Sequence, residues 1–278
     1  MWIPIVCMLA VQISAGWIGW RLGLRLTERN RIWTMAGGVA GLVLAVTARD
    51  AWWPLKWFPV TELVIWGDWS APFAALLAGL TLTAMHLTRW RRMLIAVVLI
   101  TVVNVVTWSP WWRSAPLMSD TWDGACCLQS TDSTCAPAAA ATLLRAYGIV
   151  SSEASLARDC LTTDKGTSRW GLWRGLRRAT VDSAYQVRAS DEDLDTVMTH
   201  LPAIISVVLT KAQNEADPRY ANEWGWIVGQ PHAVVLLGRG DRAGTMRIAD
   251  PKIGVETWDE AGVRALWNCQ VFWLQNRR

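Results

Sequence analysis

The chain contains one cysteine and one histidine whose local sequences suit nucleophilic catalysis. Cys135 directly precedes residues 136–147, which are predicted to form a helix because a proline lies in the first turn and a glycine follows the last. A helix N-terminus offers free N–H groups and partial positive charge, which stabilise the reactive thiolate. His232 directly precedes a predicted strand over residues 233–237, a position that suits a general base. This pair predicts attack by sulfur on a carbonyl group.

Two further polar residues lie where such a nucleophile needs support. Gln129 is six residues before Cys135, across a polar turn, and its side-chain amide can donate a hydrogen bond to an oxyanion. Asp250 ends a predicted strand over residues 245–249, and the end of one strand lies beside the start of its antiparallel hairpin partner. We therefore expect Asp250 next to His232, where a carboxylate fixes the imidazole tautomer. The structural alternatives are a surface role for Gln129 and a turn role for Asp250 before a proline.

The other histidine and cysteines of residues 115–278 are expected to be structural. His200 is predicted to end a helix and to interact there as a cation with the helix C-terminus. Four other cysteines form an even set, which outside the cytoplasm permits two disulfides whose pairing stays open: Cys126, Cys127, Cys160 and Cys269. Because they contain no Cys-x2-Cys pair, we expect no metal, and no other cofactor is implied.

The elements that must position these residues follow from local patterns. Predicted helices cover residues 136–147, 152–159, 168–179, 191–201 and 259–267. Predicted strands, rich in β-branched and other apolar residues, cover 203–209, 233–237, 245–249, 255–258 and 271–274. Helices followed by an antiparallel sheet are typical of the α+β class.

One connection within the predicted sheet is unusually long. Residues 210–231 join two strands that we expect to pair, and they carry Tyr220, Trp224 and Trp226. We expect this loop either to shape a substrate cleft or to lie on a membrane.

The chemistry-bearing residues occur in an order that resembles the C39 peptidase family. The shared features are Gln129-x5-Cys135, the helix that follows, Gly166-Thr167, His232-Ala-Val-Val and Ile248-Ala-Asp250-Pro251. That family, the bacteriocin-processing type of papain-like cysteine peptidase, cleaves peptide bonds. The resemblance covers about residues 125–275 and implies Cys135 as nucleophile, His232 as base, Asp250 as orienting residue and Gln129 as oxyanion donor.

The sequence also departs from that family's pattern. The family commonly has Asp-Cys-Gly at the nucleophile, whereas this chain has Thr134-Cys135-Ala136, which bears on the shape of the subsites. The best-known members remove leader peptides after a Gly-Gly pair and are fused to an ABC exporter. No phosphate-binding P-loop occurs in this sequence, so a separate exporter is left open as a partner.

The N-terminal part of the sequence predicts a membrane region. Residues 1–114 contain 13 of the 21 tryptophans, and they carry 10 Lys and Arg residues against 4 Asp and Glu. Four apolar segments lie within them: Trp2–Trp20, Ile32–Ala48, Ser70–Thr88 and Met93–Trp108. Each is near the minimum length that spans a bilayer, so we predict about four transmembrane helices over residues 1–114 and a peptidase domain over 115–278.

Arginines predict how this region is oriented. Clusters lie between the first and second segments and between the third and fourth, at residues 21–31 and 89–92. The positive-inside rule places both in the cytoplasm, and therefore places the peptidase domain outside it.

The same arginines account for the basic net charge, so we expect the lipid bilayer and not nucleic acid as the partner. The first segment lacks a positive n-region, which favours a retained helix over a signal peptide. The loop Asp50–Trp69 is predicted to lie at the outer interface.

These observations predict a membrane-anchored cysteine peptidase that forms an acyl-enzyme with a peptide or protein substrate, such as a secreted peptide that it processes. Two alternatives remain open: an idle binding or sensor domain of the same fold, and a transamidase that uses the same Cys-His-Asp site. The sequence leaves the substrate and the need for a Gly-Gly pair undetermined.

Overall fold

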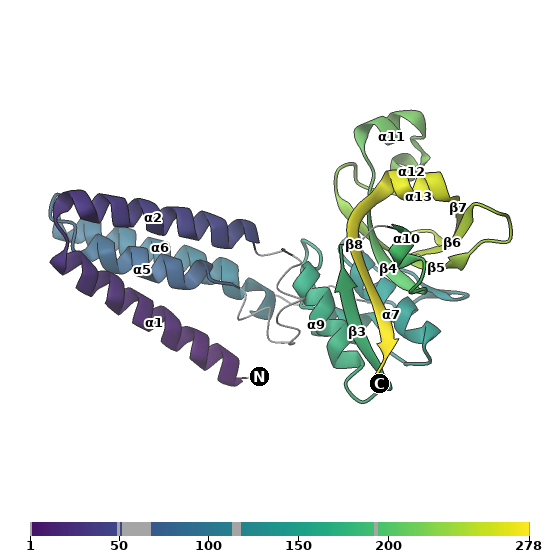
Figure 1. Ribbon diagram of the computed structural model, residues 1–278, viewed down its shortest axis with the longest axis horizontal. Coiled ribbons are helices and arrows are strands. Elements are labelled where there is room, and N and C mark those ends of the chain that lie inside the picture. Colours follow the sequence, from purple (N-terminus) through teal and green to yellow (C-terminus); the bar gives the residue numbers. More distant parts are fainter. Residues whose placement is uncertain (1, 49–50, 52–67, 113–117, 192–193, 278) are drawn as a thin grey trace. The chain divides into compact units, whose positions relative to one another are not determined.

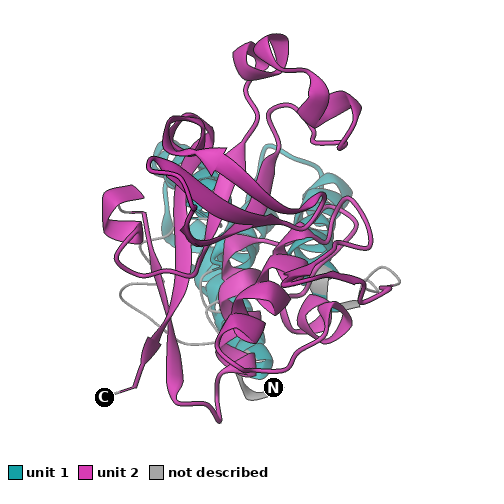
Figure 2. Cartoon of the chain, turned by 90° about the vertical axis from the view of Figure 1, so that its right-hand side faces the viewer, with its two compact units in different colours: residues 1–54, 62–113 teal, residues 55–61, 114–278 magenta. Residues whose placement is uncertain are grey.

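The computed structural model describes residues 2–48, 51, 68–112, 118–191 and 194–277 (Figure 1). Contacts within the chain divide it into two compact units (Figure 2), residues 1–54 with 62–113 and residues 55–61 with 114–278. The predicted boundary near residue 115 and most of the predicted interfacial loop Asp50–Trp69 lie outside the described residues. The assignment of 1–114 as transmembrane and 115–278 as a peptidase domain stays a prediction.

The first unit is helical. Its described helices are α1 (Trp2–Arg25), α2 (Glu28–Thr47), α5 (Ser70–Leu82) and α6 (Arg89–Trp112). The short helix α5 packs against the other three, and most of its side chains are buried. A Cβ atom on Gly79 of α5 would lie 2.1 Å from the carbonyl oxygen of Gly16 of α1. Glycine at this crossing therefore allows the two backbones to approach closely, as in many membrane helix pairs.

Two of these helices are long and apolar enough to cross a membrane. The candidate spans are Ile5–Arg25 in α1 and Arg89–Ser109 in α6, each 21 residues long. Only 17% of each apolar stretch is buried, so large apolar side chains lie on the surface. Helix α5 has 13 residues and extends about 20 Å, less than the roughly 30 Å of a hydrocarbon core. Among the described residues two of the four predicted crossings are candidates by length and composition, and the other two stay predictions.

The second unit is built on a six-stranded antiparallel sheet. The strands are β3 (Tyr185–Ser190), β4 (Ala203–Val208), β5 (Pro231–Arg239), β6 (Thr245–Asp250), β7 (Gly254–Asp259) and β8 (Trp267–Asn276). Their order in the sheet is β3-β8-β4-β5-β6-β7. The helices that precede it are α7 (Cys135–Ala146), α8 (Glu153–Asp159) and α9 (Arg169–Ala179). A short hairpin, β1 (Trp122–Asp123) with β2 (Cys126–Cys127), lies before them. This arrangement confirms the predicted α+β class.

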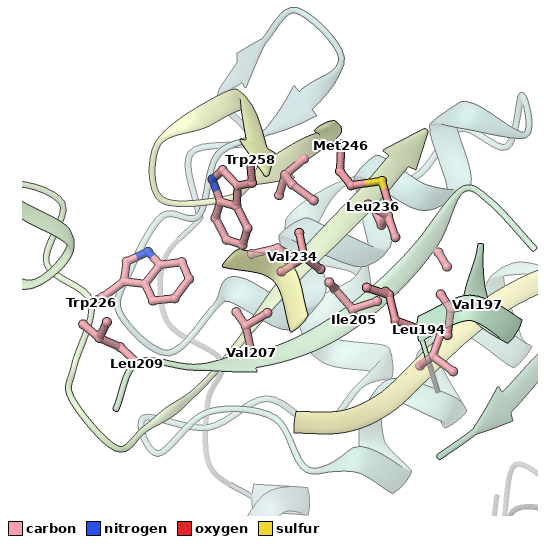
Figure 3. Close-up of a cluster of buried hydrophobic side chains, with 14 residues drawn as sticks. Leu194, Val197, Ile205, Val207, Leu209, Trp226, Val234, Leu236, Met246 and Trp258 are labelled. Carbon is pink, nitrogen blue, oxygen red and sulfur yellow. The ribbon is translucent and has the colours of Figure 1, made fainter. Parts of the chain in front are cut away.

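Both faces of the central strands are buried. On one face, alternate residues of β5, such as Val234 and Leu236, belong to one apolar cluster together with Ile205 of β4 (Figure 3). Residues on the other face, such as Val235 and Ala249, are also fully buried, and helix α7 packs against β4, β5 and β6. Burial on both faces explains why these strands have continuous apolar sequences. Small fully buried alanines at 138–141 let α7 lie close to the sheet.

One predicted helix is shorter than expected. The described residues of the range 191–201 contain the four-residue helix α10 (Leu194–Val197), and the preceding strand β3 was not expected. Strand β3 is at the edge of the sheet and pairs only with β8, and only Val187 in it is buried. An edge strand with one buried side chain lacks the apolar alternation that predicts strands. The long loop contains two further short helices, α11 (Lys211–Ala216) and α12 (Arg219–Asn222).

The predicted disulfides are also wrong, because all six cysteines have free thiols. Cys126 and Cys127 are adjacent in β2, so their side chains point to opposite sides of the strand. Cys160 is buried against α9, where a Cβ on Gly175 would lie 2.2 Å from its sulfur, whereas Cys269 is exposed on β8. Burial raises the pKa of Cys126, Cys127 and Cys160 to about 12, so these thiols stay protonated near neutral pH.

Candidate active site

Helix α7 presents Cys135 at its first residue. The preceding residue, Thr134, donates its hydroxyl to the carbonyl of Thr131 over 3.0 Å and makes no side-chain cap to the helix. The first-turn N–H groups are therefore left for other acceptors. The backbone N–H groups of Ala136 and Ala233 hydrogen-bond to the sulfur, so α7 and β5 both hold it.

Strand β5 places His232 beside this sulfur. His232 pairs with Val207 of the neighbouring strand β4, and its side chain is only 13% exposed. The imidazole forms a hydrogen bond with Cys135 on one side. On the other side its Nε2 lies 2.7 Å from Oδ1 of Asp250. The structure thus brings three of the four predicted site residues into one hydrogen-bonded chain.

Strand register explains why Asp250 reaches the histidine. Val235 of β5 pairs with Ala249 of β6, so His232 and Asp250 are diagonal neighbours on the same face. The Asp250 side chain is fully buried and accepts two further hydrogen bonds. The Lys252 backbone N–H lies 2.8 Å from Oδ1, and the Trp226 indole N–H lies 3.0 Å from Oδ2. Such donors compensate a buried carboxylate for its lost hydration.

These contacts change the proton affinities of the pair. Burial alone would lower the pKa of His232, but its hydrogen bonds with Asp250 and Cys135 outweigh burial and raise the pKa to about 10. Burial alone would raise the pKa of Cys135, but the hydrogen bond and charge of His232, with two backbone N–H groups, lower it below its usual value. Both shifts favour a thiolate paired with an imidazolium over a neutral thiol and a neutral imidazole.

Gln129 lies in the same site. Its backbone N–H donates to the Pro251 carbonyl over 2.7 Å, which ties the nucleophile's loop to the turn after β6. Its side-chain Nε2 donates to the carbonyl of Thr131 over 2.8 Å, and its Oε1 is buried without a partner among the described residues. Gln129, Cys135 and His232 all line one small hollow of about 30 Å³.

A larger cleft opens beside the sulfur. Its volume is about 220 Å³. The walls come from the start of α7, the segment 165–169, strands β4 and β5, and Gln270 and Phe272 of β8. Gly166 and Thr167, which belong to the resemblance noted in the sequence, are part of this wall.

Two residues at the site were missed by sequence reasoning. Trp226 donates to Asp250, and its ring lies 4.7 Å from that of His232 between centroids. Lys252 forms an ion pair with Asp132, which connects the turn after β6 to the loop before Cys135. Trp226 lies in the loop 210–231, which was expected to shape the cleft. The length and aromatic content of this loop were the sequence signals that could have pointed to Trp226. The predicted contact of that loop with a membrane stays a prediction.

The competing histidine lies elsewhere. The ring of His200 stacks on that of Trp273 with centroids 4.7 Å apart, and His200 lines neither hollow beside Cys135. No cluster of His, Cys, Asp and Glu in the described part of the chain is arranged to hold a metal ion.

Several solved structures are similar to part of this chain. Among solved structures, the chain is similar to the peptidase domain of ComA of Streptococcus, a bifunctional ABC transporter, with 20% identity, a TM-score of 0.41, and 54% of this chain and 96% of that chain covered. It is similar to a double glycine motif protease from an AMS/PCAT transporter, solved with the leader peptide, with 14% identity, a TM-score of 0.40, and 54% and 89% covered. The C39-like domain of a toxin secretion ATP-binding protein of Vibrio parahaemolyticus has 12% identity, a TM-score of 0.36, and 53% and 100% covered.

Sequence comparison is decisive where these structural similarities are weak. A search of curated proteins gives no match. The model of the Peptidase_C39 like family matches residues 122–273, which is more than half of the sequence and includes the whole candidate site. By this match, the chain belongs to the Peptidase_C39 like family.

Proposed function

We propose that this chain is a membrane-anchored cysteine peptidase that cleaves peptide bonds through an acyl-enzyme. The observation that carries the proposal is the hydrogen-bonded chain Cys135–His232–Asp250 at the N-terminus of α7. A nucleophile, a base within reach and a third group that orients the base are the parts that covalent catalysis requires. An idle binding domain would not need to keep all three in contact, which favours an enzyme over that alternative.

The first half-reaction follows from these contacts. The Cys135 thiolate attacks the peptide carbonyl carbon, and the carbonyl electrons move onto oxygen. The Cys135 backbone N–H, at the uncapped helix start, and the amide of Gln129 hold the resulting oxyanion. The His232 imidazolium gives its proton to the leaving amine as the C–N bond breaks, which leaves a thioester on Cys135 and neutral imidazole.

The second half-reaction regenerates the pair. Neutral His232 takes a proton from water as the water oxygen attacks the thioester carbonyl. The tetrahedral intermediate expels Cys135 as thiolate, and the acyl half leaves as a carboxylic acid. Asp250 keeps the imidazole oriented throughout and stabilises its cation. An amine in place of water would make the same site a transamidase.

The cellular setting belongs to the proposal as well. Helices α1 and α6 would anchor the chain in the bilayer, with the peptidase domain on the extracytoplasmic side and a peptide or protein in the cleft. A separate exporter would be a partner that delivers such a peptide. A reporter enzyme fused after Arg278 should be active only outside the cytoplasm, and activity inside would reverse the proposed orientation.

Peptide cleavage tests the proposed activity. Purified full-length protein in detergent would be incubated with paired synthetic peptides that differ only in a central Gly-Gly or Ala-Ala, and the products identified by mass spectrometry. We expect cleavage at a single bond in at least one peptide. If both peptides stay intact although the Cys135 thiol is shown to be reduced, hydrolysis of these substrates is contradicted.

The pH dependence of alkylation is a further expected result. Because His232 lowers the pKa of Cys135, the midpoint of its reaction with iodoacetamide should lie below the ordinary thiol value of about 8.5. The reaction should not fall when His232 deprotonates at about pH 10, because the sulfur is still a thiolate. In His232→Ala the buried thiol loses this support, so the midpoint should move to higher pH. Exposed Cys269 in the same samples gives the internal reference. Equal midpoints in both proteins would contradict the ion pair.

Gln129 should contribute to the transition state and not to formation of the thiolate. For Gln129→Ala we expect kcat/KM to fall about 100-fold, as for loss of one oxyanion donor, with the alkylation profile of Cys135 unchanged. Gln275→Ala, on the exposed end of β8, is the matched control and should keep full activity. An unchanged kcat/KM in Gln129→Ala would remove Gln129 from the mechanism.

A further inference from the structure

We propose that Trp226 is a positioning residue that holds the carboxylate of Asp250 and shields its contact with His232. This inference rests on the proposed peptidase function. It adds a fifth residue, from the loop 210–231, to the Gln-Cys-His-Asp set. Trp226 contacts both members of the pair. Its indole N–H lies 3.0 Å from Oδ2 of Asp250, and its ring is tilted by 56° against the His232 ring with centroids 4.7 Å apart.

The loop 210–231 is built to keep this indole in place. Trp226 is only 6% exposed, and its backbone N–H donates to the Tyr220 carbonyl over 2.8 Å. The Tyr220 ring packs edge-on against three tryptophans, with centroids 4.7 Å from Trp224, 5.1 Å from Trp226 and 6.0 Å from Trp258. Farther along, the Gly229 N–H donates to the Leu209 carbonyl over 2.8 Å, which closes the loop at its base. These contacts fix Trp226 before any substrate binds.

The indole acts on Asp250 in two ways. By occupying Oδ2, it leaves Oδ1 directed at His232, so the carboxylate cannot rotate without losing a buried hydrogen bond. The ring also covers one side of the imidazole and limits water there, which strengthens the electrostatic contact between the two groups. Without the N–H donor, Oδ2 would be a buried charged acceptor with no partner in the described part of the chain, since the Asp250 side chain is fully buried. Asp250 would then turn toward other donors and hold His232 less well.

A matched pair of substitutions separates this role from general packing. Trp226→Phe keeps a ring and removes the donor to Asp250. Trp258→Phe is made in the same aromatic cluster at a residue that is also 6% exposed. Its indole N–H donates to Glu256 over 2.9 Å and not to the catalytic pair. Both substitutions remove a bulky buried indole and its N–H, so they share the cost in packing.

Kinetics on full-length protein give the first readout. We expect Trp226→Phe to lower kcat about 10- to 100-fold with KM nearly unchanged, as for loss of one hydrogen bond to a charged group. Trp258→Phe should stay within about twofold of wild type. Equal losses in the two variants, or no loss in Trp226→Phe, would overturn the positioning role.

A spectroscopic readout keeps this inference separate from the proposed function. The proton between Nε2 of His232 and Asp250 should give a low-field 1H NMR signal, which can be followed in the inactive Cys135→Ala background. We expect that signal to shift and to exchange faster with water when Trp226→Phe is added, and to stay unchanged with Trp258→Phe. An unchanged signal with Trp226→Phe refutes the inference even if no peptide is ever cleaved.

Discussion

Replacement of Cys135 by alanine is expected to abolish peptide cleavage, with a fall in kcat of at least about 10⁴-fold. In enzymes that use a nucleophile and its base as one unit, removal of either costs a loss of this order or more. Alanine leaves His232 and Asp250 in contact but provides no atom that can accept the acyl group. Peptide binding in the 220 Å³ cleft should survive, because most of its wall is unchanged. The measurement is single-turnover cleavage combined with equilibrium binding of the same peptide.

The other thiols explain why no substitute nucleophile is expected. Cys126, Cys127 and Cys160 are buried with pKa values of about 12, so they contain almost no thiolate near neutral pH. Cys269 is exposed on β8, and its alanine variant is the matched control that should retain activity. Residual cleavage in Cys135→Ala at the wild-type rate, or its loss in Cys269→Ala, would assign the nucleophile to another residue.

Replacement of Asp250 by asparagine is expected to have the second-largest effect, a fall in kcat of about 10³- to 10⁴-fold. Asparagine has nearly the same shape, but its neutral amide does not stabilise the His232 imidazolium and can favour the wrong tautomer. The pKa of His232 should then fall, because the hydrogen bond and the charge of Asp250 both raise it. The Cys135 pKa should rise in turn, because the imidazolium is what lowers it.

This change has a signature in pH as well as in rate. Alkylation of Cys135 in Asp250→Asn should be slower than in wild type near neutral pH. Its rate should increase at higher pH, where the thiol ionises without an imidazolium beside it. Asp241→Asn, in the exposed turn between β5 and β6, is the control for loss of one carboxylate and should match wild type. Wild-type rates and an unshifted alkylation profile in Asp250→Asn would show that the carboxylate has no part in the mechanism.

Much of the fold could be predicted because its signals are local. Helix α7 has a proline in its first turn and a glycine after its end, and strands β4, β5 and β6 are apolar because the sheet is buried on both faces. The antiparallel hairpin of β5 and β6 follows from their short connection, and it brings His232 next to Asp250. The catalytic roles of these residues stay predictions until they are tested.

What the sequence could not predict depends on long-range geometry. Strand β3 is defined by its pairing with β8, about 85 residues later in the chain, and not by its own pattern. Four cysteines form an even set, but the side chains of the adjacent pair in β2 point to opposite sides of that strand, and Cys269 lies on β8, in a different sheet. The hydrogen bond from Trp226 to Asp250 depends on a loop folded around Tyr220, which no spacing rule describes.

Site-specific labelling tests most directly whether the sulfur and the imidazole work together. Full-length wild type, Cys135→Ala and His232→Ala would be treated at neutral pH with a thiol-reactive acyl probe, and the modified residue located by tandem mass spectrometry. We predict acylation of Cys135 in wild type, none at that position in Cys135→Ala, and a strong decrease in His232→Ala. Equal labelling of all three proteins would contradict a reactive Cys135–His232 pair.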